Sequence, residues 1–324
     1  MSKHLVIIHG RDKKPECEQL LRLIKKALVA GLRRLDENAA NQLDKGELPI
    51  TLAYYGDINN RLLIARRPEL KSIMHQMNGN WYVQDDYYDE DLQRLMERPL
   101  TQFDRKHYDE HMRDHKLIGL QDDIAQAVSP LFSLFELSNR IIRSVLPDLG
   151  AYLNSRVVGS EIRERLQEPL AKALNQSDDV MLISHSMGCM VAYDVLWKFS
   201  RMSEYKHLWD KGLNVWLTIG NPLGEPSVAK GLYDSYEPLD GKFPRNIKKW
   251  INVNAVDDYI AHDTTIADDF SPMIKEGLIE LIKDEPTIYN FWKDHNGRCN
   301  PHNLFGYLNH PDVSAHIAKW ITSS

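Results

Sequence analysis

Cysteine is scarce in this chain of 324 residues, where it occurs only as Cys17, Cys189 and Cys299. The three are widely spaced and odd in number, which argues against a disulfide framework and favours a reducing compartment. No secretory signal precedes the first strand-like run at 5–8, so we expect a cytoplasmic protein.

Long apolar runs and an excess of basic residues are also missing. No run approaches the roughly 18 apolar residues that a membrane-spanning helix needs, so no transmembrane segment is expected. The 40 Lys and Arg residues are outnumbered by 46 Asp and Glu, and the formal net charge is −6. Nucleic-acid binding needs a basic face, so no nucleic-acid partner is expected. The hydrophobic share of 43% is enough for a substantial core.

Short apolar runs alternate with amphipathic segments along much of the chain. This alternation predicts the α/β class, with a mostly parallel central sheet and helices on both faces. Chemistry in such sheets lies at the carboxyl ends of the strands. Strands are predicted at 5–8, 49–55, 180–183, 213–219, 250–254 and near 287–292, and helices at 16–35, 160–174, 190–196 and 313–321.

The stretch from about 58 to 158 interrupts this alternation. Its pattern is mostly helical and rich in aromatic residues, and its second half holds the apolar residues Leu131, Phe132, Leu134 and Phe135. We interpret it as a helical insertion in a single domain of residues 1–324, forming a cap or lid that covers the strand ends and sets substrate choice. The alternative is a peripheral helical layer with no role at the site.

Ser186 stands in the most informative segment, Ser184-His185-Ser186-Met187-Gly188, which follows an apolar run and precedes a helix-like pattern. A strand, a serine flanked two places away by small residues, and a helix together form the nucleophile-elbow pattern. The tight turn has no room for bulky flanking side chains, and it lifts the hydroxyl out of the sheet. Ser184 replaces the first glycine of the pattern. The other interpretation is a chance Ser-x-Gly at an ordinary strand-to-helix junction.

A serine hydroxyl needs a base to take its proton and an acid to orient that base. In this type of fold the order along the chain is Ser, acid, His. Asp257 and Asp258 both follow a predicted strand. We prefer Asp258, because it begins the turn that leaves the sheet, although an acid at a strand end is often only a helix cap.

The candidate base is His302, which lies between the last predicted strand and the last predicted helix. His310 is the nearest rival, and His295 is the weaker alternative. The chain holds 13 histidines, so some fall in loops by chance. The order of serine, acid and histidine after the elbow is the stronger argument.

Two backbone donors are expected for the oxyanion of the intermediate. One is the N–H of Met187, next to the serine. The second should come from the loop after the first central strand, where we assign the Arg11 N–H, with Gly10 as the alternative. The Arg11 side chain could instead hold an acidic group of the substrate.

Taken together, these segments resemble the α/β-hydrolase family, and within it the serine esterases and lipases. The resemblance is carried by Val6-Ile7-Ile8-His9-Gly10, by residues 184–188, by Asp258, and by His302 with the segment to Leu308. It implies an eight-stranded sheet, no cofactor and a covalent acyl-enzyme. We therefore expect a serine hydrolase with the triad Ser186, His302 and Asp258. Its substrate would be a small-molecule carboxylic ester with a lipid-like or aromatic acyl chain.

Two other functions are compatible with the same residues. An acyltransferase would use the same triad with an acceptor other than water. A non-catalytic member of the fold would bind a ligand or partner, but the intact order of serine, acid and histidine disfavours it.

His107, His111 and His115 repeat every four residues and would share one stripe of a helix. Imidazoles at this spacing can bind zinc. The neighbouring residues are strongly charged, so a solvated helix face is the preferred interpretation and no metal is expected.

Overall fold

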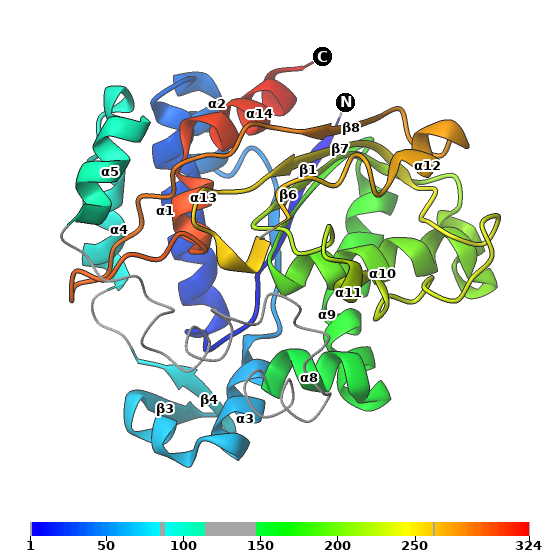
Figure 1. Cartoon of the computed structure of the whole chain (residues 1–324), viewed down its shortest axis with the longest axis horizontal. Helices are drawn as coiled ribbons and strands as arrows, with labels where there is room; N and C mark the ends of the chain where they lie inside the picture. The colour runs from blue at the N-terminus through cyan, green and yellow to red at the C-terminus, as the bar shows by residue number, and fades with distance from the viewer. Residues whose placement is uncertain (1, 85–87, 114–146, 262, 324) are drawn as a thin grey trace.

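The computed structural model describes residues 2–84, 88–113, 147–261 and 263–323. Its centre is a sheet of six parallel strands in the order β2-β1-β5-β6-β7-β8 (Figure 1). The strands are β1 (Lys3–Ile8), β2 (Ile50–Ala53), β5 (Asp179–His185), β6 (Leu213–Ile219), β7 (Ile247–Val253) and β8 (Leu281–Asp284). The predicted α/β class and parallel sheet are confirmed. Within the described residues the sheet has two strands fewer than the eight that the resemblance implies.

The alternation of side chains along β1 explains the two helical layers. Leu5 and Ile7 belong to one apolar core, and Val6 and Ile8 belong to the other, because successive side chains of a strand point to opposite faces. The first core is covered by α1 (Cys17–Arg33), α2 (Glu37–Asp44), α13 (Leu304–Leu308) and α14 (Pro311–Thr322). The second is covered chiefly by α9 (Arg156–Gln176) and α10 (Met187–Arg201). Helices therefore cover both faces, as predicted.

The last strand lies earlier in the chain than predicted. β8 occupies Leu281–Asp284, at the edge of the sheet, and not the run near 287–292. In that run Ile288 makes a single bridge to Ala255, while Phe291 and Trp292 are buried in the first core. The prediction was wrong because apolar side chains that fill a core from an extended loop give the same pattern as a buried strand.

The described part of the 58–158 region contains a hairpin as well as helices. It includes β3 (Met74–Met77) and β4 (Asn80–Val83), which pair antiparallel. Its helices are α4 (Tyr88–Met96), α5 (Arg105–Arg113) and α8 (Pro147–Asn154), and α3 (Gly56–Arg66) runs into it. In Figure 1, α4 and α5 lie beside α1, whereas α3, the hairpin and α8 lie below the sheet. Leu131, Phe132, Leu134 and Phe135 fall outside the described residues.

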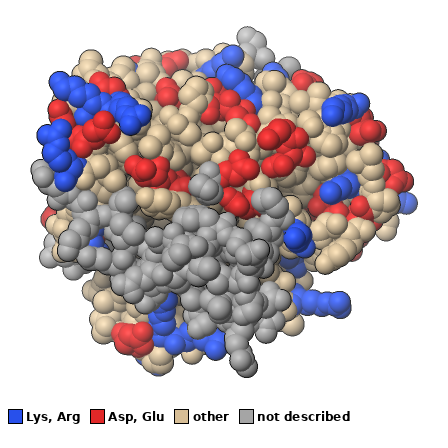
Figure 2. Space-filling view, in the orientation of Figure 1, with Lys and Arg blue, Asp and Glu red and all other residues tan. Residues whose placement is uncertain are grey.

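Shorter elements complete the described fold. They are α11 (Pro226–Ala229), α12 (Ser271–Lys275) and the 3₁₀ turns η1 (Pro68–Ile73), η2 (Leu100–Gln102), η3 (Ser203–Leu208) and η4 (Tyr259–Ala261). On the face in Figure 2, Lys and Arg side chains lie in separate groups among Asp and Glu. None of the described helices is long and apolar enough to cross a membrane.

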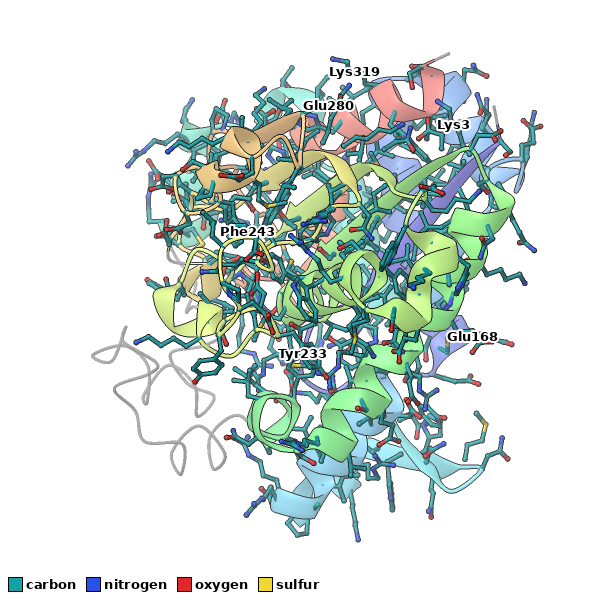
Figure 3. All side chains as sticks on the ribbon, turned by 90° about the vertical axis from the view of Figure 1, so that its right-hand side faces the viewer. Lys3, Glu168, Tyr233, Phe243, Glu280 and Lys319 are labelled. Carbon is teal, nitrogen blue, oxygen red and sulfur yellow. The ribbon has the colours of Figure 1, made fainter. Side chains whose placement is uncertain are left out.

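A buried carboxylate joins α8 and α10 to the segment after α11. Asp194 of α10 accepts a hydrogen bond from the Tyr152 hydroxyl of α8 at 2.5 Å and one from the Tyr233 backbone N–H at 2.9 Å. The Arg163 guanidinium lies 3.7 Å away. A similar bond joins Tyr193 of α10 to Asp234, which also accepts from the Phe243 N–H. Figure 3 labels Tyr233 and Phe243, whose backbone N–H groups donate to these two carboxylates.

Burial raises the pKa of Asp194 from 3.8 to about 6, since it disfavours the charged form. A raised carboxyl pKa gives stability that is complete below about pH 3.8 and is lost as the pH rises through 6. The free energy of unfolding of the wild type, measured against that of Asp194→Asn by denaturant titration, should fall by on the order of 3 kcal/mol between pH 4 and pH 7. The surface variant Asp210→Asn should show no such change. A flat difference for Asp194→Asn would contradict the assignment.

Candidate active site

Ser186 occupies a strained turn between β5 and α10. Its backbone has φ +56° and ψ −130°, a conformation that non-glycine residues rarely adopt. Ser186 is the N-cap of α10, so its hydroxyl lies at the N-terminal end of the helix. Within the described residues, the backbone N–H of Met187 makes no hydrogen bond.

Two close approaches explain why small residues surround this turn. A Cβ added to Gly188 would lie 2.6 Å from the carbonyl oxygen of His9, in the loop after β1. A Cβ added to Gly10, in that same loop, would lie 2.6 Å from the Cβ of Ser186. Any larger residue at either position would push the loop away from the serine.

Ser184, which stands where the pattern has glycine, is fully buried and accommodated by hydrogen bonds. Its hydroxyl accepts from the Trp216 indole N–H at 2.8 Å and lies 3.3 Å from the Cys189 sulfur. Trp216 in turn stacks on Trp250, with ring centroids 4.3 Å apart. The extra hydroxyl therefore has partners from the neighbouring strand and from α10.

The structure brings Ser186, His302 and Asp258 into one hydrogen-bonded chain. The Ser186 hydroxyl lies 2.8 Å from Nε2 of His302, and Nδ1 of His302 lies 2.8 Å from both carboxylate oxygens of Asp258. Because a carboxylate only accepts, Nδ1 carries the proton and Nε2 is left to accept from the serine. The side chain of Asp258 is fully buried, whereas that of His302 is 20% exposed.

Further hydrogen bonds fix the carboxylate of Asp258. The Tyr307 hydroxyl donates to Oδ2 at 2.6 Å, and the backbone N–H groups of Ile260 and Ala261 lie 3.0 and 3.3 Å from Oδ1. Tyr307 also accepts from the Ala255 N–H at 2.9 Å. The segment containing Tyr307 was noted in the sequence, but its contact with the acid was not predicted, since nothing in the local pattern indicates it.

His185, the residue between Ser184 and Ser186, makes a hydrogen bond to the backbone of His302. Its Nε2 lies 2.8 Å from the carbonyl oxygen of His302, so this nitrogen carries a proton and donates. The two rings lie 4.7 Å apart. Burial, followed by the repulsion from His302 when that imidazole is protonated, keeps the pKa of His185 well below its usual value, so the ring is neutral.

Gly220, at the end of β6, makes room for the histidine and the acid. Its φ is +54°, and an added Cβ would lie 3.1 Å from His302 ring atoms and 3.2 Å from Oδ2 of Asp258. Both the left-handed backbone and the lack of space require glycine here.

The rival residues from the sequence lie elsewhere. His310 is buried as the N-cap of α14, where its Nδ1 accepts from the Asp312 N–H at 3.2 Å, and burial lowers its pKa to about 3. His295 lies 3.7 Å from Asp91. The Asp257 carboxylate accepts from the Tyr108 hydroxyl at 3.3 Å.

The side chain of His9, in the loop after β1, packs against a neighbouring aromatic residue. Its ring stacks on Tyr55 at 4.2 Å, and its Nε2 accepts from the Tyr55 N–H. Burial lowers the pKa of His9 to about 3. Arg11 also turns inward, since its Nε donates to Asp148 at 3.1 Å. Within the described residues, the Arg11 backbone N–H makes no hydrogen bond.

His107 and His111 have different partners. Nδ1 of His107 lies 2.7 Å from Asp104, and Nε2 of His111 lies 3.3 Å from the Cys299 sulfur, while His115 is outside the described residues. No group of three or more His, Cys, Asp or Glu residues in the described part of the chain could hold a metal ion.

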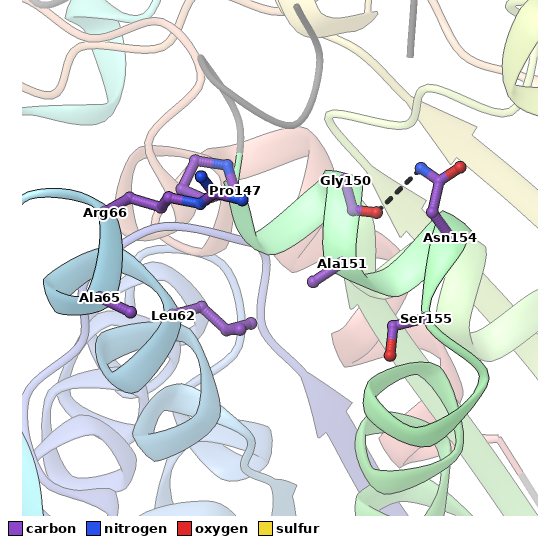
Figure 4. Close-up of a pocket in the computed structure, with 8 residues that line it drawn as sticks. All are labelled: Leu62, Ala65, Arg66, Pro147, Gly150, Ala151, Asn154 and Ser155. Atoms are coloured by element: carbon purple, nitrogen blue, oxygen red, sulfur yellow. Dashed lines mark hydrogen bonds between the residues drawn. The ribbon is translucent and has the colours of Figure 1, made fainter. Parts of the chain in front are cut away.

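A groove of about 270 Å³ lies between α3 and α8 (Figure 4), and neither Ser186 nor its hydrogen-bond partners line it. Its walls are mostly apolar, and one polar wall residue, Asn154, donates to the Gly150 carbonyl oxygen at 2.9 Å. The lining residues are Leu62, Ala65, Arg66, Pro147, Gly150, Ala151, Asn154 and Ser155.

Comparisons with protein-family models, with curated proteins and with solved structures find no match to this chain. The chemistry of the site is therefore inferred from its side chains alone.

Removing the hydroxyl of Tyr307 should destabilise the protein. Tyr307→Phe removes one of the donors to the buried carboxylate of Asp258 and takes away the acceptor of the Ala255 N–H, and hydrogen bonds to charged groups contribute about 1.5–3 kcal/mol. Chemical denaturation should show a loss of that size. Tyr236→Phe is the matched control, because Tyr236 is 94% exposed and its variant should be as stable as the wild type. Equal stability of the two variants would show that the Tyr307 contact contributes nothing.

Proposed function

We propose that the protein is a serine hydrolase that cleaves carboxylic esters through an acyl-enzyme. The observation that carries this proposal is the chain of three hydrogen-bonded side chains, with Ser186 in a strained turn at a helix N-terminus. Each member has the geometry that its role demands, and each comes from a different loop at the carboxyl edge of the sheet.

In the proposed first step, the Ser186 oxygen attacks the ester carbonyl carbon while Nε2 of His302 takes its proton. The carbonyl π electrons move onto the oxygen, giving a tetrahedral oxyanion. Asp258 keeps the proton of His302 on Nδ1 and stabilises the imidazolium that forms. Collapse of the intermediate breaks the bond to the alcohol oxygen, which leaves with the proton from Nε2.

In the second step, water attacks the acyl-enzyme by the same route. His302 takes a proton from the water and returns one to the Ser186 oxygen, and the carboxylic acid leaves. The backbone N–H groups of Met187 and Arg11 are the proposed donors to the oxyanion, and neither has a partner in the described residues. Gly10 remains the alternative for the second donor.

The proposed mechanism predicts covalent labelling of one serine. A fluorophosphonate probe should modify the wild type at Ser186, because among the serines of the described residues its hydroxyl is the one hydrogen-bonded to an imidazole that can accept its proton. Ser186→Ala should abolish both labelling and hydrolysis of p-nitrophenyl butyrate, with an unchanged circular-dichroism spectrum. Ser184→Ala is the matched control and should still be labelled. Peptide mapping that places the probe on another residue would refute the assignment.

The mechanism also predicts different effects for two neighbouring carboxylates. Asp258→Asn should lower kcat by on the order of 10⁴, because the amide no longer holds the required tautomer of His302. Asp257→Asn changes the adjacent residue, which faces Tyr108, and should leave kcat nearly unchanged. Both variants should be measured at equal concentrations of folded protein. If Asp257→Asn has the larger effect on kcat, the acid has been misassigned.

A further inference from the structure

The loop after β1 is anchored on one side by a buried carboxylate from the 58–158 region. Asp148, in the first turn of α8, has a side chain with no exposed surface. Its Oδ1 accepts from Nε of Arg11 at 3.1 Å, and its Oδ2 accepts from the backbone N–H of Asp12 at 2.7 Å. One carboxylate thus binds two consecutive residues of the loop. Such charge-assisted hydrogen bonds are stronger than those between neutral groups.

On its other side, the loop is anchored by an ammonium group. Nζ of Lys14 donates to the carbonyl oxygen of Arg11 and lies 3.3 and 3.4 Å from those of Asp12 and Lys13. Asn59 of α3 adds a bond to the Asp12 carbonyl oxygen at 3.3 Å. The carbonyl groups of three consecutive residues are therefore gathered around one cation.

This arrangement fixes a backbone that would not hold its shape alone. Asp12 has φ +76°, in the left-handed region that costs a non-glycine residue free energy. With the carbonyl oxygens bound to Lys14 and the Asp12 N–H bound to Asp148, the Arg11 N–H is left without a partner in the described residues. The same loop contacts Ser186, as the close approach of Gly10 shows.

We propose that Asp148 and Lys14 are positioning residues, which hold the loop so that the Arg11 N–H donates to the oxyanion formed at Ser186. This inference rests on the proposed function, since the oxyanion belongs to the ester reaction. It gives α8 a role in the chemistry, although no residue of α8 contacts the reacting atoms.

The test compares Asp148→Asn with Glu161→Gln. Glu161 binds Arg61 at 2.7 Å on the surface between α9 and α3, so its variant removes an ion pair of similar type without touching the loop. With active sites counted by fluorophosphonate titration, kcat per site should fall about 10- to 100-fold in Asp148→Asn, while KM changes by less than about threefold. Glu161→Gln should match the wild type.

A second kinetic readout separates positioning from stability. A trifluoromethyl ketone forms a tetrahedral oxyanion on a reactive serine, so its inhibition constant should rise in Asp148→Asn by about the factor lost in kcat. A purely structural role would lower the fraction of titratable sites and the melting temperature, but leave kcat per site and the inhibition constant unchanged. That result would overturn the proposal.

Hydrogen–deuterium exchange tests the loop without using activity. Amides of residues 10–14 should exchange faster in Asp148→Asn than in the wild type or Glu161→Gln, and unchanged exchange would overturn the proposal. If the wild type neither reacts with the probe nor cleaves esters, the proposed function fails, while exchange still decides whether Asp148 anchors the loop.

Lys14→Gln provides a second variant in case Asp148→Asn does not fold. Loss of the ammonium removes the contacts to three carbonyl oxygens, so exchange in residues 10–14 should again increase and kcat per site should fall by a similar factor. Lys13→Gln is the matched control, since the Lys13 side chain makes no hydrogen bond to the loop among the described residues. Equal kcat and exchange in the two lysine variants would overturn the role of Lys14.

Discussion

The candidate site depends on how closely two stretches of backbone approach each other. The loop after β1 and the turn after β5 come from adjacent parallel strands, so they leave the sheet side by side. Gly10 and Gly188 allow them to touch, because any Cβ at either position would lie 2.6 Å from an atom of the other segment. Only at such a separation can a backbone N–H of the first loop donate a hydrogen bond to a group held at Ser186 on the second. The strained backbone of Ser186, which costs on the order of 1–3 kcal/mol, is tolerated because β5 is buried along its whole length and α10 is almost as deeply buried.

Asp258 and His302, the other two members of the hydrogen-bonded chain, are also positioned by contacts between loops. Asp258 follows β7 and His302 precedes α13, so both approach Ser186 from loops with no sequence proximity to it. Two hydrogen bonds fix these loops in place. Tyr307 binds the carboxylate of Asp258, and His185 binds the backbone carbonyl oxygen of His302. The first contact is made to Oδ2 of Asp258 and the second to the carbonyl oxygen of His302. The imidazole therefore has its orientation set by partners on two sides before any substrate binds.

Local patterns in the sequence were sufficient for much of the central sheet and for the residues that the structure brings together. Strand β5 and helix α10 are continuous apolar and amphipathic segments, so the turn between them could be located from the sequence. Asp258 and His302 were then chosen because this type of fold has its serine, acid and histidine in that order along the chain. The edge strand β8 was misplaced, because Phe291 and Trp292 are buried from a loop. Short-range patterns also carry no information on which distant residue meets a given loop. The contacts of Asp148 with Arg11 and of Tyr307 with Asp258 join residues 137 and 49 positions apart, and only the tertiary structure reveals them.

These long-range contacts change how the 58–158 region is understood. From the sequence, its apolar residues indicated a cover over the strand ends. Those apolar residues lie outside the described part, which meets the loop after β1 through polar groups. Asn60 bonds both the N–H and the carbonyl oxygen of Lys14, and the Val83 N–H bonds the same oxygen. Asp148 completes the set from α8. Apolar packing would tolerate small shifts of the loop, whereas directional hydrogen bonds to consecutive backbone groups fix its position. On the proposed mechanism, these contacts couple α8 to the reaction, so substitutions at Asp148 would alter turnover.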